Sequence, residues 1–160
     1  MNDSWLETMR KQIFHADSYA WLCRLREQVH EMVLNHLQAA DPLECNHQMN
    51  QLHDWLIRRT VMLAEGALLD RGMGLPPVSY AFVLFGSGGR QEQTLWSDQD
   101  NGLIYQDPPA GIALEAESYF RCLGDEIVEG LMLLGYPPCE GNVLCRNPMW
   151  CTALSNWKET

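Results

Sequence analysis

The chain has 160 residues, of which 46% are hydrophobic and 20% are charged. That composition supports a buried core and excludes a disordered chain. Eleven basic residues stand against 21 acidic ones, and the resulting net charge of −10 disfavours binding to nucleic acid.

The sequence carries no pattern that predicts a membrane or secretory segment. Its start, Met1–Trp5, is polar, and the longest apolar runs, such as Ala81–Phe85, are too short to cross a bilayer. Six cysteines follow no disulfide-scaffold or CxxC spacing, which favours reduced thiols in the core. We therefore expect a cytoplasmic protein with neither a membrane nor a nucleic-acid partner.

The first seventy or so residues predict helices. Apolar residues recur at helical spacing over Tyr19–Leu37. A second helix should begin after Asp41 as its N-cap, with Pro42 at the first helical position. We expect it to end at Arg71 and Gly72, because glycine is favoured just beyond a helix.

A different composition follows the break made by Gly72, Gly74 and the pair Pro76–Pro77. Runs rich in β-branched and aromatic residues predict strands, and a long amphipathic stretch predicts a helix. The elements expected here, in chain order, are a strand at Val78–Phe85, a turn at Gly86–Gly89, a short helix at Arg90–Leu95, a strand at Asn101–Tyr105, a helix at Leu114–Leu134, a strand at Asn142–Cys145 and a helix start at Asn147–Trp150.

These elements predict an α+β fold in which a helical N-terminal segment, residues 1–74, precedes a small mixed-sheet core with flanking helices, residues 75–160. Three strands are few for an independent sheet. We therefore expect either a fragment of a longer protein or a sheet that depends on its helices and a partner. An alternative working part is the segment 1–74, as a helical hairpin for oligomerisation or partner docking.

The most informative stretch is FGSGGRQEQTLWSDQD at residues 85–100, where an apolar strand runs into a turn of small residues. Such a turn leaves backbone N–H groups free to hold phosphate oxygens. The stretch lacks the Lys of a Walker A loop, and Gln91 stands where a dinucleotide-binding motif has its third glycine. Taken alone, the turn fits a plain glycine-rich connection equally well.

Two aspartates, Asp98 and Asp100, end the same stretch. At alternate positions of an extended chain they project from one face, where they can share a divalent metal such as Mg²⁺. Taken alone, acidic residues just before a strand are more often simple turn residues. The step of nine residues from Gly89 to Asp98 makes the combination far more specific than either half.

The run LFGSGGRQEQTL at 84–95, with SDQDN at 97–101, resembles a bacterial nucleotidyltransferase family whose members often accompany CBS or cyclic-nucleotide-binding domains. That family is similar to the uridylyltransferase of the nitrogen-regulatory protein and belongs to the DNA polymerase beta-like superfamily. The segments GYPPCEGNV at 135–143 and NPMW at 147–150 also resemble it. The resemblance covers roughly residues 50–160 and implies a nucleotidyltransferase-type core.

The resemblance also implies roles for the matching residues. Gly86 and Ser87 would bind the triphosphate of an NTP, and Asp98 and Asp100 would be catalytic and hold Mg²⁺ or Mn²⁺. Arg90 has two interpretations of equal weight, pairing with phosphate or bracing the loop through a nearby acid.

Two features of the superfamily have no clear counterpart here. Many members carry a third carboxylate on a later strand, and the expected strand at Asn142–Cys145 contains none; Glu140 is the nearest substitute. A helical C-terminal domain, thought to bind substrate, usually follows in the family.

The resemblance implies transfer of a nucleoside monophosphate to a protein or small-molecule hydroxyl in signalling or regulation. The alternative is a catalytically inactive nucleotide-binding regulatory module.

Overall fold

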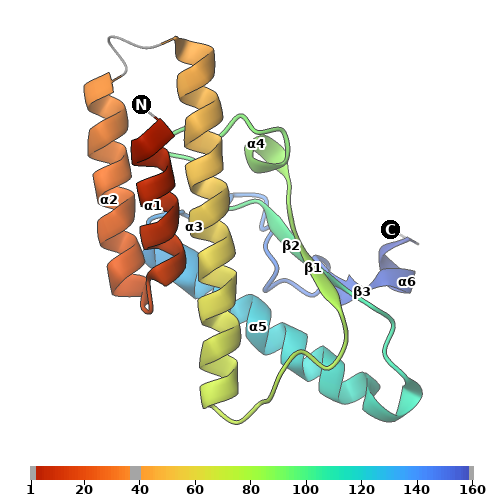
Figure 1. Cartoon of the computed structure of the whole chain (residues 1–160). Coiled ribbons are helices and arrows are strands. Elements are labelled where there is room, and N and C mark those ends of the chain that lie inside the picture. Colours follow the sequence, from red (N-terminus) through yellow and green to blue (C-terminus); the bar gives the residue numbers. More distant parts are fainter. Residues whose placement is uncertain (1–2, 37–40, 159–160) are drawn as a thin grey trace.

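Helices form the N-terminal part of the computed structural model, which describes residues 3–36 and 41–158 (Figure 1). Helix α1 spans Asp3–His15, α2 spans Tyr19–His36 and α3 spans Pro42–Asp70. Each of the three contacts the other two. The helical N-terminal segment predicted from the sequence is confirmed, with α1 as a separate helix that the periodicity did not delimit; Leu37, the expected end of α2, lies outside the described residues.

The start of α3 follows the sequence prediction. Asp41 is the N-cap, and its side chain accepts a hydrogen bond of 3.1 Å from the backbone N–H of Leu43. Pro42 occupies the first helical position, where no N–H is needed. At the other end Gly72 adopts a φ of 81°, a left-handed conformation that glycine tolerates and that stops the helix.

A mixed sheet of three strands follows, in the order β1-β2-β3. Strand β1, Tyr80–Leu84, pairs antiparallel with β2, Asn101–Tyr105, so that Tyr80 lies opposite Tyr105. Strand β3, Cys151–Ala153, runs parallel to β2, with Leu103 opposite Cys151. The predicted α+β class with a small mixed sheet is therefore confirmed.

Helix α5, Ala113–Leu133, follows the short 3-10 turn η1, Ala110–Ile112, and contacts α3, β2 and β3 (Figure 1). Its Phe120 is fully buried and stacks on Tyr105 of β2, with ring centroids 4.4 Å apart. Helices therefore cover one face of the sheet. The short helix α6, Leu154–Trp157, contacts β2 and β3 near the end of the chain.

Three local predictions are wrong, and backbone geometry explains each. The strand expected at Asn142–Cys145 does not form, because Asn142 takes a left-handed φ of 53°. The helix expected at Arg90–Leu95 does not form, because Gln91 takes a left-handed φ of 56°. Residues Asn147–Trp150 form a turn in which the Asn147 side chain accepts from the Met149 N–H at 3.1 Å.

One core extends over both parts of the chain. Arg26 of α2 is only 5% exposed, stacks on the ring of Tyr136 at 4.0 Å and donates to the backbone oxygen of Leu134. His53 of α3 lies 2.6 Å from the Tyr136 hydroxyl. The boundary between residues 74 and 75 stays a prediction, and buried side chains from both sides of it belong to one cluster.

No helix among the described residues is both long enough and apolar enough to cross a membrane. All six cysteines are free thiols.

The buried pair of His53 and Tyr136 predicts a pH dependence of stability. Burial, helped by the nearby Arg26 charge, lowers the pKa of His53 to about 4, and burial raises the pKa of Tyr136 to about 12, so the phenol keeps its proton. Unfolded His takes up a proton near pH 6.5. The unfolding free energy should therefore be highest above pH 6.5 and fall, by up to about 3 kcal/mol in total, as the pH drops toward 4.

Urea titrations between pH 7.5 and 5 measure this slope. The variant His53→Gln should lose most of it, because glutamine takes up no proton in that range. An unchanged slope in His53→Gln would contradict the assignment.

Candidate functional site

Burial alternates along the segment between the glycine turn and β2, which makes a turn at Leu95 and Trp96 and then pairs at Gln99 with Pro138. The exposed side chains include Thr94, Trp96 and Asp98, and Asp100 is half-buried. The buried ones are Gln93, Leu95, Ser97, Gln99 and Asn101. The alternation places Asp98 and Asp100 on one side of the segment and away from the core, as the spacing of the two residues predicts.

Hydrogen bonds of the buried side chains fix this orientation. The Gln99 amide donates to the backbone oxygens of Tyr136 at 2.9 Å and Val128 at 3.2 Å. Asn101 accepts from the Cys145 N–H at 2.8 Å through its side-chain oxygen. Both side chains are at most 3% exposed, so these bonds satisfy polar groups that water does not reach.

Asp100 meets the glycine turn directly. The Phe85 N–H donates to the backbone oxygen of Asp100 at 2.9 Å. A Cβ placed on Gly86 would collide with Asp100 Oδ2 and lie 3.2 Å from its Cγ, and Gly86 has a φ of 50°. The same narrow crevice is lined by Gly88, Asp98 and Asp100, so the turn and both aspartates form one site.

The turn itself is a single helical turn, α4, at Gly86–Gly89. The first amides of a helix have no acceptor within it. Here Gly89 donates back to Phe85 at 2.9 Å, whereas the N–H groups of Gly86, Ser87 and Gly88 donate to no other described residue. The Ser87 hydroxyl likewise makes no hydrogen bond within the described chain. Three amides and a hydroxyl are therefore available to phosphate oxygens.

Arg90 forms an ion pair with Glu92, at 2.8 Å between Nε and Oε2. Both side chains are about 60% exposed, with values of 63% and 60%. An exposed pair of this kind contributes between about 0 and 1 kcal/mol, so Arg90 can exchange it for a phosphate at little cost. The structure shows Arg90 paired with Glu92, and the pairing of Arg90 with phosphate stays a prediction.

Cys139 is a neighbour of the two aspartates that the sequence did not single out. Burial, a hydrogen bond to Asp100 and the negative charges of Asp100 and Asp98 together raise the pKa of its thiol. The Cys139 sulfur also accepts from the Val143 N–H at 3.1 Å, which closes the 139–143 loop on itself. The only hint in the sequence was the family-like segment 135–143.

Glu140 follows Cys139 and is exposed in this loop. Strand β3 reads Cys-Thr-Ala and holds no carboxylate. Within residues 3–36 and 41–158, no three His, Cys, Asp or Glu side chains cluster closely enough to hold a metal ion together. The described site thus offers a pair of carboxylates.

Helix α3 supports the site through Asn50, which sequence reasoning missed. Its side-chain oxygen accepts from the Gln93 N–H at 3.0 Å, and its amide donates to the backbone oxygen of Asn46 at 2.8 Å. Gln93 is itself buried. Asn46 and Asn50 are one helical turn apart, but they lie in a mostly polar stretch, so no signal in the sequence marked Asn50.

Comparison with known families gives one match. A family model described as "Putative nucleotidyltransferase DUF294" matches residues 25–160, and the chain belongs to this family. The match begins within α2 and includes the glycine turn and both aspartates. Neither the curated proteins nor the solved structures gave a match.

The contact between Gly86 and Asp100 predicts that alanine is not tolerated at position 86. A Cβ there meets the Asp100 carboxylate, and a left-handed φ costs a non-glycine residue about 1–2 kcal/mol. Gly86→Ala should therefore lower the unfolding free energy by at least about 1 kcal/mol.

The matched control is Gly66→Ala within α3, where an added Cβ has no atom within 4 Å. Alanine is favoured over glycine inside a helix, so this variant should gain about 1 kcal/mol. Denaturant unfolding of both variants makes the comparison, and equal stabilities would refute the close approach of Asp100.

Proposed function

We propose that this chain is the core of a metal-dependent nucleotidyltransferase, which transfers a nucleoside monophosphate from an NTP to a hydroxyl group. The proposal rests on one observation: a candidate metal-binding pair lies beside a candidate phosphate-binding turn. Asp98 and Asp100 face one side beside a turn whose Gly86, Ser87 and Gly88 amides have no acceptor among the described residues. Membership of the nucleotidyltransferase family supports it.

The residues present fit Mg²⁺ or Mn²⁺. Magnesium commonly takes one or two protein carboxylates and completes its octahedron with water and substrate phosphates, which matches a site with two aspartates. Asp98 and Asp100 would be its ligands, and the bound ion would neutralise charge that grows on the phosphoryl oxygens. Without such a cation, two adjacent carboxylates repel each other.

The protein groups have separate tasks in the transfer. The α4 amides and the Ser87 hydroxyl hold the triphosphate, and Arg90 exchanges Glu92 for a phosphate oxygen. The acceptor oxygen forms a bond to the α-phosphorus while the bond from that phosphorus to the bridging oxygen breaks. Pyrophosphate leaves with the electron pair, and the acceptor proton passes to solvent.

The acceptor in this proposal is a protein side chain or a small molecule. A net charge of −10 disfavours nucleic acid as the acceptor. A role in signalling or regulation, together with CBS or cyclic-nucleotide-binding domains, is proposed from the resemblance of the sequence motifs alone.

A transfer assay with α-labelled NTP and the purified protein tests the proposal. Asp98→Ala and Asp100→Ala should each lower the rate by at least about 100-fold, because each removes a charge-stabilising group from the reacting centre. Equal labelling by wild type and both variants would contradict the mechanism.

Two further variants serve as controls. Glu115→Ala removes an exposed carboxylate of α5 and should leave the rate unchanged. Glu140→Gln should change the rate by less than about tenfold, a loss smaller than that of general acid–base groups. A loss at Glu140 as large as that at Asp98 would identify it as the third acid.

One observation favours the inactive regulatory module as a second candidate. Strand β3 carries no carboxylate, so the described residues supply no general base there. Calorimetric titration with NTP and Mg²⁺, followed by a pyrophosphate assay, separates the two functions. Binding without pyrophosphate release indicates a sensor, and pyrophosphate release on addition of an acceptor indicates an enzyme.

A further inference from the structure

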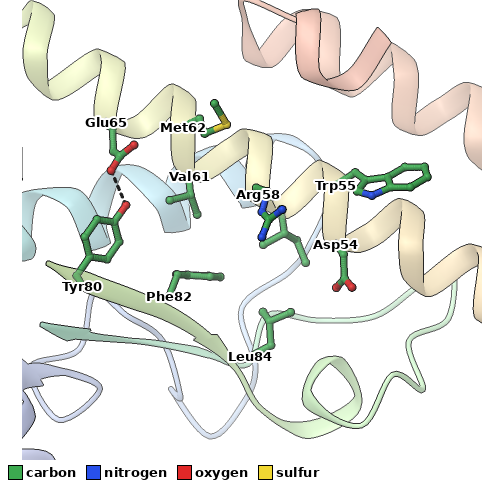
Figure 2. A pocket seen from close by; sticks show the side chains of 10 residues that line it. Asp54, Trp55, Arg58, Val61, Met62, Glu65, Tyr80, Phe82 and Leu84 are labelled. Atoms are coloured by element: carbon green, nitrogen blue, oxygen red, sulfur yellow. Dashed lines mark hydrogen bonds between the residues drawn. The ribbon is translucent and has the colours of Figure 1, made fainter. Parts of the chain in front are cut away.

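An open pocket of about 550 Å³ lies between α3 and β1 (Figure 2). Its α3 side is lined by Asp54, Trp55, Ile57, Arg58, Val61, Met62 and Glu65, and its β1 side by Tyr80, Phe82 and Leu84. Neither aspartate of the candidate nucleotide site lines it. A cavity of this size accommodates a small organic molecule.

The pocket is lined by both polar and apolar side chains, and Phe82 and Leu84 form an apolar part of its β1 side. Figure 2 shows Phe82 and Leu84 extending from β1 toward α3, below Val61. At one end the Tyr80 hydroxyl donates to Glu65 Oε1 at 2.7 Å, so Glu65 already has a partner. A ligand with an apolar portion can therefore lie against Phe82 and Leu84 and remove part of their apolar surface from water.

Two side chains of opposite charge, both exposed, also line the pocket. Asp54 and Arg58 are one helical turn apart on α3, and both extend toward β1 in Figure 2. Residues four apart on a helix commonly pair. Here neither side chain makes a hydrogen bond, or an ion pair within 4.0 Å, with another described residue.

The surroundings of Asp54 favour a positively charged partner for its carboxyl group. Partial burial raises the pKa of the Asp54 carboxyl, and the charge of Arg58 only opposes the rise. A cationic group placed against Asp54 would therefore stabilise its charged form. An anionic group placed against Arg58 can accept two parallel hydrogen bonds from the guanidinium.

We propose that the pocket binds a free α-amino acid with an apolar side chain. Its ammonium group pairs with Asp54, its carboxylate pairs with Arg58, and its side chain packs on Phe82 and Leu84. A simple acid or a simple amine would leave one of the two charges unpaired. The zwitterion satisfies both at once, which is why this chemical class fits best.

The amino acid would sit next to the candidate nucleotide site without entering it. Ile57 and Leu84 line both the pocket and the crevice that holds Asp98 and Asp100. A Cβ on Gly88 would lie 3.3 Å from Leu84 Cβ, so Leu84 directly supports the α4 turn. Binding of the amino acid does not require transferase activity, and the two proposals fail or hold independently.

Titrations followed by NMR test the proposal with three probes: L-phenylalanine, phenylacetate and 2-phenylethylamine. Phenylalanine should bind at one site, shift amide resonances of α3 and β1, and bind at least about tenfold more tightly than either probe with one charge. Arg58→Gln should weaken phenylacetate about tenfold and leave 2-phenylethylamine unchanged. Asp54→Asn should do the reverse.

The controls carry the same charge changes outside the pocket. Arg24→Gln and Glu31→Gln alter exposed residues of α2 and should leave all three affinities unchanged. The proposal is overturned if phenylalanine gives no saturable shift of α3 and β1 amides up to its solubility limit. It is equally overturned if Arg58→Gln weakens the amine as much as the acid.

Discussion

The hydrogen bonds of the buried Gln99 side chain are the constraint on which the candidate site depends. In an extended chain, a slip of one residue would exchange the two faces and turn both aspartates toward the core. The backbone oxygens of Val128 and Tyr136 accept from Gln99 and oppose that slip, because a slip would bring Asp98 or Asp100 there and a carboxylate donates no hydrogen bond. Two residues later, the Asn101 side chain accepts a hydrogen bond from the Cys145 N–H and fixes the same register.

The helical N-terminal segment contributes to the site through Tyr136. The backbone oxygen of Tyr136 holds Gln99, its ring carries the Arg26 guanidinium, and its hydroxyl meets His53. Asn50, one turn before His53 on α3, binds Gln93 at the start of the extended segment. Helices α2 and α3 therefore fix both ends of the stretch that presents the aspartates, and the α3–β1 pocket lies on the same scaffold.

The sequence predicted the helices and strands that depend on residues close together in the chain. Capping by Asp41 and Pro42 located the start of α3, and the apolar run Asn101–Tyr105 is β2. Strand β3 escaped prediction because its three residues gain their partner from β2, some fifty positions earlier. The alternate spacing of Asp98 and Asp100 predicted their shared face, whereas the approach of Cys139 and the pocket around Asp54 and Arg58 exist only after α3, β1 and the 139–143 loop pack together.

A crystal structure with Mg²⁺ and a non-hydrolysable NTP tests the central claim most directly. The account predicts a metal ion bound to carboxylate oxygens of both Asp98 and Asp100, and triphosphate oxygens on the amides of Gly86, Ser87 and Gly88. A nucleotide seated elsewhere, or a metal ion that touches neither aspartate, would contradict it.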